Sequence, residues 1–408
     1  MPTEKTFIET ELTKPSADIS IIRLVAYIVE FAYTSRASDI HIDPAEVAVK
    51  IRFRIDGVMN DVFTIPKEIQ QEMISRIKVL SGLRTDEHQG PQDGRFKFTT
   101  EDGKIRFDMR VSIAPTYYGE NCVLRLLVEQ GEAFTLETIG FSKRDSEAVH
   151  RAMLRPYGMI LATGPTGSGK TTTLYTILKE LNTPKVSIIT IEDPIEYSLE
   201  GVDQIQVNNQ TGLTFANGLR SILRQDPNII MVGEIRDEET AAIAVNAALT
   251  GHLLLSTLHT NDAATTLPRL LDMKIEPFLI GSTVNIAIGQ RLIRKLCPAC
   301  KKEKVLTEDE IKALSESLPK EFLAKHKVFY GPVGCKECNM AGYRSRIGIH
   351  EVLEVTDTIR DAIMRRVSSS EIKKIALAEG MVTILQDGLN KAAEGITSIE
   401  EVLRVIHE

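Results

Sequence analysis

The stretch from Met159 to Leu181 constrains the fold of this chain more than any other. It begins with an apolar run, passes through a glycine-rich segment and ends in an amphipathic segment, which predicts a strand, a loop and a helix in that order. Residues Gly164 to Thr171 fit the phosphate-binding pattern G-x-x-x-x-G-K-S/T, and the predicted strand and helix are the context that this pattern requires. The alternative, a chance glycine-rich turn, would not need these flanks.

The residue types in this loop suit a nucleotide and its metal ion. Glycines let backbone N–H groups turn toward one point, and the helix N-terminus adds the positive end of its dipole. Lys170 is expected to reach the outer phosphates of ATP, and the Thr171 hydroxyl to ligate Mg²⁺. The expected nucleotide contacts are Gly164, Pro165, Thr166, Gly167, Ser168, Gly169, Lys170, Thr171 and Thr172.

Short aliphatic strands alternate with helical patterns from Met159 to about Gly289, which predicts an α/β domain around a largely parallel sheet. The expected strands are 159–163, 186–191, 229–233 and 252–258. In open sheets of this kind, ligands bind at the carboxyl ends of the strands. Polar residues follow the expected strands at that end, so we expect them to line the nucleotide site.

Hydrolysis of a nucleotide needs a carboxylate that orients water and groups that stabilise the developing charge. Glu234 is the first candidate for orienting the water or for holding Mg²⁺ through water, and Glu196 is the second. His259 is predicted to sense the γ-phosphate. His252, which opens the same strand, is equally consistent with a structural role.

The N-terminal third has a different pattern. We expect a flexible arm over 1–17, an α+β domain over 18–128 that opens with a helix capped by Asp18, and a linker over 129–141. Within the domain, apolar residues alternate along 47–55 and 105–113, and a helical pattern covers 69–80. Ser142, followed three residues later by Asp145, predicts the start of the next helix.

Basic residues gather on the polar faces of these N-terminal strands, among them Arg52, Arg54, Arg106, Arg110 and Arg125. A solvated sheet face is the simpler explanation for any single arginine. A carboxylate-poor face with several guanidinium groups would instead suit nucleotide phosphates. The sequence alone is consistent with a solvated face and with a face that contacts phosphates.

Four of the five cysteines form two C-x-x-C pairs, Cys297 with Cys300 and Cys335 with Cys338. Four thiolates are enough for a closed tetrahedral Zn²⁺ site, and a helix over 307–318 would fill the gap between the pairs. The alternative is two free turns. Cys122 is interpreted as a small buried hydrophobe.

Charge and hydropathy exclude some classes of protein. The net charge of −7 and the pI near 5.8 argue against a broad nucleic-acid surface. No apolar run approaches the roughly 18 residues that span a bilayer, and the N-terminus lacks a charged-then-apolar signal. We therefore expect a cytoplasmic protein without direct DNA contact.

From about residue 18 to its end, the chain resembles the secretion ATPases of type II secretion and type IV pilus systems. Four segments carry this resemblance and correspond to that family's Walker A, acidic, Walker B and histidine boxes. They are Gly164–Thr171, Ile191–Tyr197, Leu219–Pro227 leading into Val232–Asp237, and Gly251–Asp262.

The resemblance implies a homohexamer that works an inner-membrane platform protein and is peripheral to the membrane through its partners. It implies a P-loop, RecA-like ATPase domain over 142–408, with a zinc subdomain over 291–345 and C-terminal helices over 356–408. The 18–128 domain would be PAS-like and would supply Arg95 and Arg110 to the nucleotide, where an arginine can be worth roughly 10³ to 10⁵ in rate. Relatives usually carry a further N-terminal domain that docks a membrane-associated partner, whereas here the expected arm over 1–17 precedes the first expected helix.

The four cysteines resemble the pilus-assembly and type II branch of the family, which implies ATP-driven assembly of a pilus or pseudopilus. A retraction ATPase is the alternative within the family. A nucleotide-gated ring scaffold with little hydrolysis is the alternative from another class. A conjugation or DNA-uptake role is conceivable, although the acidic charge offers no support for DNA contact.

Overall fold

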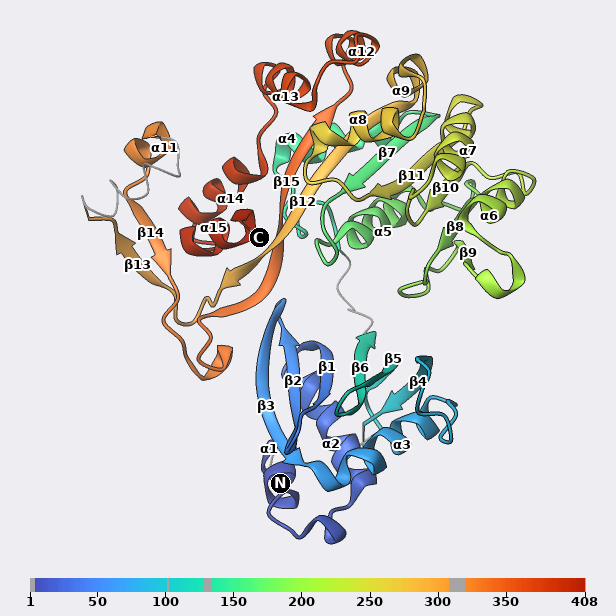
Figure 1. Cartoon of the computed structure of the whole chain (residues 1–408). Helices are drawn as coiled ribbons and strands as arrows, with labels where there is room; N and C mark the ends of the chain where they lie inside the picture. Colours follow the sequence, from blue (N-terminus) through green and yellow to red (C-terminus); the bar gives the residue numbers. More distant parts are fainter. Residues whose placement is uncertain (1–3, 101–102, 128–133, 308–319, 408) are drawn as a thin grey trace. The chain divides into compact units, whose positions relative to one another are not determined.

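The structure, a computed structural model, describes residues 4–100, 103–127, 134–307 and 320–407. The chain divides into two compact units, Met1–Glu132 and Ala133–Glu408, each with its own apolar core (Figure 1). Of the linker expected over 129–141, residues 129–133 lie outside the described residues. Leu136 and Phe141 are buried in the core of the second unit, so this part of the expected linker belongs to a folded domain.

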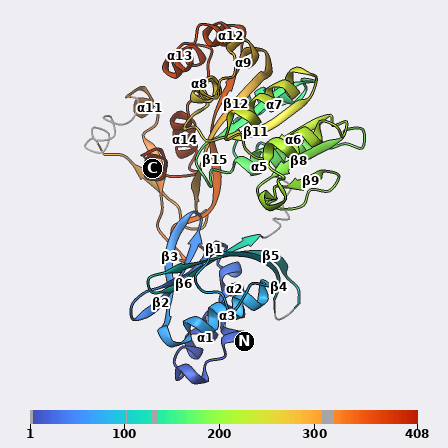
Figure 2. The same ribbon diagram turned by 45° about the vertical axis from the view of Figure 1, so that its right-hand side comes forward.

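The first unit is an α+β fold built on one antiparallel sheet with strand order β3-β2-β1-β6-β5-β4. Helices α1 to α3 all lie on one face of this sheet (Figure 2). The elements are α1 (Glu4–Glu11), α2 (Ile21–Thr34), β1 (Ala37–Pro44), β2 (Ala48–Ile55), β3 (Val58–Pro66), α3 (Gln70–Leu80), β4 (Gln92–Thr99), β5 (Arg106–Thr116) and β6 (Gly119–Leu127).

The period-two pattern sets which side chains enter this core. Ile51 and Phe53 of β2 are fully buried, while Arg52 between them has its side chain on the other face. Asp56 and Gly57 join β2 to β3 with positive φ angles of 49° and 86°, the geometry of a two-residue hairpin turn.

The flexible arm expected over 1–17 is wrong for the residues that the structure describes. Residues Glu4–Glu11 form α1, whose Ile8 is fully buried in the core. The Glu11 carboxylate accepts a hydrogen bond from the Ser20 backbone N–H at 3.2 Å, which ties α1 to the start of α2. Asp18 lies in a short 3₁₀ turn and Ser20 occupies the N-cap position, so the expected cap at Asp18 is also wrong.

The second unit is built on a seven-stranded sheet of order β15-β12-β7-β11-β10-β8-β9. All neighbouring strands are parallel except β15, which runs antiparallel to β12. The strands are β7 (Gly158–Thr163), β8 (Ile188–Glu192), β9 (Asp203–Gln206), β10 (Ile229–Val232), β11 (Leu253–Leu258), β12 (Val284–Leu296) and β15 (Tyr343–Glu354). The four strands expected from the sequence are thus β7, β8, β10 and β11.

Helices cover both faces of this sheet, as expected for buried parallel strands. One apolar core joins the sheet to α6 to α9, α12 and α13, and the other joins it to α4 and α5. Ser142 caps α4 by accepting a hydrogen bond from the Asp145 N–H, as predicted. The helices are α4 (Lys143–Met153), α5 (Lys170–Leu181), α6 (Phe215–Ile222), α7 (Glu238–Leu249), α8 (Ala263–Asp272), α9 (Pro277–Thr283), α11 (Lys320–Lys325), α12 (Asp357–Met364), α13 (Ser369–Ala378), α14 (Ile384–Ala393) and α15 (Ile399–His407).

Strands β12 and β15 continue beyond the rest of the sheet as a two-stranded ribbon. β12 pairs with β7 only as far as Gly289, whereas its pairing with β15 continues to Leu296. At the end of this ribbon lie the four cysteines and a small sheet of β13 (Lys302–Val305) and β14 (Val328–Gly331). The helix expected over 307–318 lies outside the described residues apart from its first residue. The mixed α/β fold class with a smaller α+β unit is confirmed.

Candidate nucleotide and metal sites

The glycine-rich loop joins β7 to α5 at the carboxyl edge of the sheet. Gly164, Gly167 and Gly169 have positive φ angles of 146°, 78° and 89°, which side chains rarely adopt. A Cβ on Gly164 would lie 2.5 Å from the Gln290 carbonyl oxygen, so only glycine fits there. Gly169 caps α5, whose unpaired N–H groups therefore face the loop.

The other loop residues fit a bound phosphate. The Lys170 ammonium donates to the Gly164 and Pro165 carbonyl oxygens at 2.9 and 3.0 Å, which curls the loop around it. Burial lowers the pKa of Lys170. Among the described residues, Ser168 Oγ is buried without a hydrogen-bond partner. The remaining predicted contacts line the same turn, with Pro165, Thr166 and Gly167 exposed and Thr171 and Thr172 half-buried.

Gln290 supports the loop from behind and was not singled out in the sequence. Its side chain is buried, donates to the Ser168 carbonyl oxygen at 2.7 Å and accepts from the Thr173 hydroxyl at 2.9 Å. The signal that could have found it is an amide that directly follows the apolar run 286–289, because a buried amide needs partners for both of its ends.

Glu234 and His259 follow neighbouring strands and meet at the same edge of the sheet. His259 Nε2 lies 3.2 Å from Glu234 Oε2, and the Arg236 guanidinium lies 2.6 Å from Glu234 Oε1. The carboxylate is nearly buried while the imidazole is half exposed. Glu234 also raises the pKa of Lys170 against the larger effect of burial, which indicates that the two charges are close. Arg236 was missed by sequence reasoning.

The three acidic residues at and just after the end of β8 are placed differently from one another. Glu192 is buried and accepts hydrogen bonds from Tyr175, from Thr190 at 2.5 Å and from Gln204 at 3.1 Å, which indicates a structural role. Asp193 is exposed. Glu196 is half-buried, and no hydrogen bond or ion pair from the described residues engages its carboxylate. Its catalytic role stays a prediction.

His252 lies at the opposite edge of the sheet from His259. Its Nδ1 lies 2.9 Å from the Ala247 carbonyl oxygen, and it precedes the first residue of β11. Ligands of parallel sheets bind at the carboxyl edge. The structural interpretation of His252 is therefore favoured.

The four cysteine sulfurs form a cluster with the dimensions of a metal site. All lie within 4.8 Å of one another, and three of their separations are 3.7, 3.8 and 3.9 Å. Tetrahedral zinc with Zn–S bonds of about 2.3 Å places its sulfurs about 3.8 Å apart. Burial would raise the pKa of Cys338, but two backbone N–H donors help to lower it to about 7, which favours the thiolate that a metal needs.

The polar face of the first unit contains a row of cations that crosses the sheet. Cross-strand pairing sets Arg95 beside Arg110, Arg110 beside Arg125, and Arg125 beside Asp39. The carboxylate-poor face expected from the sequence is wrong, because Asp39 pairs with Arg125 at 2.9 Å and Asp108 pairs with Arg95 at 3.0 Å. Arg110 has no ion pair or hydrogen bond among the residues that the structure describes. Cys122, as expected, is fully buried on the other face.

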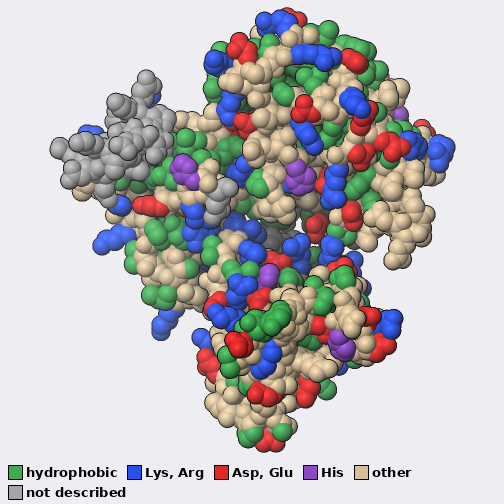
Figure 3. All heavy atoms as spheres, in the orientation of Figure 1, with side chains coloured by type: hydrophobic (Ala, Val, Ile, Leu, Met, Phe, Trp, Pro, Cys, Tyr) green, Lys and Arg blue, Asp and Glu red, His purple; other side chains and the backbone are tan. Residues whose placement is uncertain are grey.

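Basic and acidic side chains are interspersed on the face of the second unit that Figure 3 shows. No helix in the described ranges is both long enough and apolar enough to cross a membrane. A broad basic surface of the kind that binds nucleic acid is not seen on that face.

The comparisons with known proteins agree with one another on the family of the relatives. A family model described as "Type II/IV secretion system protein" matches residues 15–404. The type IV pilus assembly ATPase PilB of Myxococcus xanthus is 45% identical over 393 residues, which cover 96% of this chain and 69% of that protein. Type II secretion system protein E of Dickeya dadantii is 46% identical over 391 residues, or 96% of this chain and 76% of that protein.

Solved structures share the fold. The pilus retraction motor PilT with bound ADP has a TM-score of 0.61 and 27% identity, covering 92% of this chain and 95% of that one. The Legionella pneumophila ATPase DotB has a TM-score of 0.68, with coverage of 93% and 94%; at 23% identity it supports the fold alone.

Proposed function

Because the chain belongs to the type II/IV secretion system protein family, whose relatives here are secretion and pilus ATPases, we propose that it hydrolyses ATP to power assembly of a type IV pilus or a type II secretion pseudopilus. It acts as a cytoplasmic homohexamer at the inner-membrane face, on an inner-membrane platform protein. The observation that carries hydrolysis is the Glu234 carboxylate, nearly buried and within 3.2 Å of His259 at the strand edge that bears the phosphate-binding loop.

Each residue of the site has a role in this proposal. Backbone N–H groups of the loop and the Lys170 ammonium bind the phosphates of ATP, and Thr171 would hold Mg²⁺, which neutralises phosphate charge when bound. Glu234 orients the attacking water and accepts its proton. Its two oxygens contact Arg236 and His259, and each carboxylate oxygen keeps a further lone pair that can accept a hydrogen bond from the water.

We assign transition-state contacts to Arg95 and Arg110 of the first unit and a secondary polar role to Glu196. Among the residues that the structure describes, the Arg110 guanidinium has no carboxylate partner, and it lies next to Arg95 in the sheet. This supports the assignment, because an arginine without such a partner is available to phosphate. The four cysteines hold Zn²⁺ as a closed structural site.

An assembly or secretion motor is favoured over a retraction motor. The identity is 45–46% with the assembly and secretion relatives and 27% with PilT. A ring scaffold that binds ATP without hydrolysis would not need a carboxylate beside the phosphate site.

Turnover and oligomer mass measured in the same samples test this function. We expect the unaltered chain to assemble and to hydrolyse ATP, and Glu234→Gln to bind ATP while its turnover falls roughly 10²- to 10⁴-fold. Glu238→Gln, an exposed carboxylate on α7, is the control and should keep normal turnover. An assembled ring that binds ATP but does not hydrolyse it would support the scaffold instead.

A further inference from the structure

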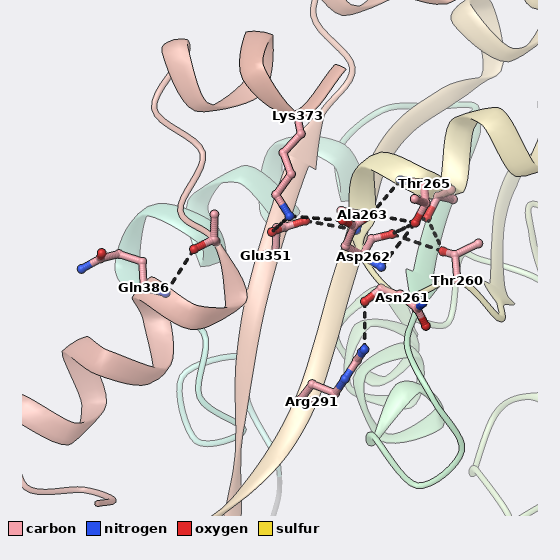
Figure 4. Close-up of polar contacts among 11 residues, drawn as sticks. Thr260, Asn261, Asp262, Ala263, Thr265, Arg291, Glu351, Lys373 and Gln386 are labelled. Carbon is pink, nitrogen blue, oxygen red and sulfur yellow. Dashed lines mark hydrogen bonds and ion pairs between the residues drawn. The ribbon is translucent and has the colours of Figure 1, made fainter. Parts of the chain in front are cut away.

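Lys373 reaches from α13, one of the helices in the C-terminal part of the chain, to the start of α8 (Figure 4). Its ammonium nitrogen lies 3.1 Å from Asp262 Oδ2 and 3.3 Å from Glu351 Oε2. Asp262 is the N-cap of α8, where its side chain accepts a hydrogen bond from the Thr265 N–H. A residue more than a hundred positions along the chain thus contacts the end of the loop that carries His259.

Glu351 makes this contact more than a surface ion pair. Its side chain on β15 is 1% exposed, and Oε1 accepts a hydrogen bond from the Ala263 backbone N–H at 3.2 Å. A buried carboxylate needs a charge partner and hydrogen-bond donors. Within the part of the chain that the structure describes, Lys373 and the Ala263 N–H of α8 are the partners of the Glu351 carboxylate, so the three groups fix one another.

The loop is also held from the side of the phosphate-binding loop. The Thr260 N–H donates to Oγ1 of Thr163, the residue that directly precedes Gly164, at 3.0 Å. Arg291, next to Gln290 on β12, donates to the Asn261 carbonyl oxygen at 3.0 Å. Every residue from Thr260 to Ala263 is therefore anchored, whereas His259 itself is half exposed and has Glu234 as its contact.

We propose that Lys373 is a positioning residue for hydrolysis: through Asp262 and Glu351 it holds the segment 259–263 so that the His259 imidazole faces Glu234. Asp262 lies three residues from His259, and Thr260 and Asn261 are held separately. Loss of the Lys373 contact therefore removes one of several anchors that place the imidazole 3.2 Å from Glu234. The proposal rests on the hydrolytic role of Glu234 and His259 proposed above. It assigns to the C-terminal helices a direct effect on the rate of the chemical step.

The variant Lys373→Met tests this inference in the full chain. Misplacement of a catalytic group by about 1 Å can cost on the order of 10²-fold, so we expect kcat to fall roughly 10- to 100-fold with ATP affinity little changed. Lys374→Met is the matched control, because Lys374 is exposed and forms no hydrogen bond or ion pair with the residues that the structure describes. Lys373→Arg, which keeps the charge, should restore most of the rate.

Lys373→Met leaves the buried Glu351 carboxylate without its cation and can destabilise the fold. The double variant Lys373→Met with Glu351→Gln removes that charge and keeps an amide oxygen for the Ala263 N–H. We expect the double variant to regain thermal stability and to keep the low kcat, because Asp262 still lacks its partner. Recovery of kcat together with stability, or normal kcat in Lys373→Met, would overturn the proposal.

Hydrogen exchange separates failure of this proposal from failure of the proposed function. If the unaltered chain does not hydrolyse ATP, the proposed function fails, but the loop can still be followed. We expect faster exchange of the Ala263 amide in Lys373→Met than in Lys374→Met without nucleotide. Equal exchange in the two variants would refute the anchoring itself.

Discussion

Replacement of Gln290 by methionine should weaken ATP binding although Gln290 is not expected to touch the nucleotide. The buried amide joins the Ser168 carbonyl of the phosphate-binding loop to the Thr173 hydroxyl of α5, at 2.7 and 2.9 Å. Methionine has a similar length but can replace neither bond. Ser168 and Thr173 would each keep a polar group that lacks its partner.

The size of the effect follows from these two groups. A buried polar group left without a partner costs about 1–3 kcal/mol, so the free energy of unfolding of the second unit should fall by about 2–6 kcal/mol. The Ser168 carbonyl can instead reach water if the loop opens, and ATP must then close the loop again. The free energy of closing the loop again, about 1–3 kcal/mol, corresponds to roughly 5- to 150-fold weaker ATP binding.

Calorimetric titration with ATP and thermal unfolding measure the two quantities. Thr173→Val is the control, because it removes only the bond to the helix and leaves the Ser168 bond in place. It should lower Tm while ATP affinity stays within about twofold, a change of under about 0.5 kcal/mol. Normal affinity in Gln290→Met, despite a lowered Tm, would show that the loop does not depend on this amide.

Three further predictions concern other parts of the chain. Arg95→Ala and Arg110→Ala should each lower turnover of the assembled protein, up to roughly 10³-fold, with Tm unchanged; Lys97→Ala is the control from the same face, and normal turnover in both would return the arginines to a solvated role. Elemental analysis should find about one zinc per chain, and chelation should lower Tm; protein purified without metal contamination that lacks zinc would reject the site. His350 is fully buried and burial lowers its pKa to about 3, so the unfolded state binds one proton more below about pH 6.5. The free energy of unfolding should therefore fall by about 2 kcal/mol between pH 7.5 and pH 5.0 in excess of the fall in His350→Phe; equal falls in urea unfolding would contradict the buried neutral imidazole.

Patterns among neighbouring residues predicted the elements whose structure depends mainly on neighbouring residues. The strands of the second unit and the glycine-rich loop follow from aliphatic runs and from residue types that suit one backbone geometry. The contact between Glu234 and His259 could be expected too, because both residues follow strands whose carboxyl ends share an edge.

Contacts set by strand order were not predictable from one sequence. Gln290 supports Ser168 across 122 positions because β12 pairs with β7. One of the two acidic residues on the arginine face, Asp39, comes from β1, a strand that the local pattern did not reveal. The arm at the N-terminus was misjudged because Phe7, Ile8 and Leu12 are too few to show a helical period, and Phe7 and Ile8 pack against residues of α2.

The ribbon of β12 and β15 gives this molecule a mechanical property. Between Gln290 and Leu296 the two strands pair only with each other among the described strands, and seven residues of strand span roughly 23 Å. A ladder of hydrogen bonds makes the pair bend and twist as one beam, with the cysteine cluster at its tip and Gln290 at its root behind the phosphate-binding loop. A sideways load at the tip is therefore shared between the root of this beam, behind the phosphate-binding loop, and α15, whose Glu401 accepts hydrogen bonds from Arg294.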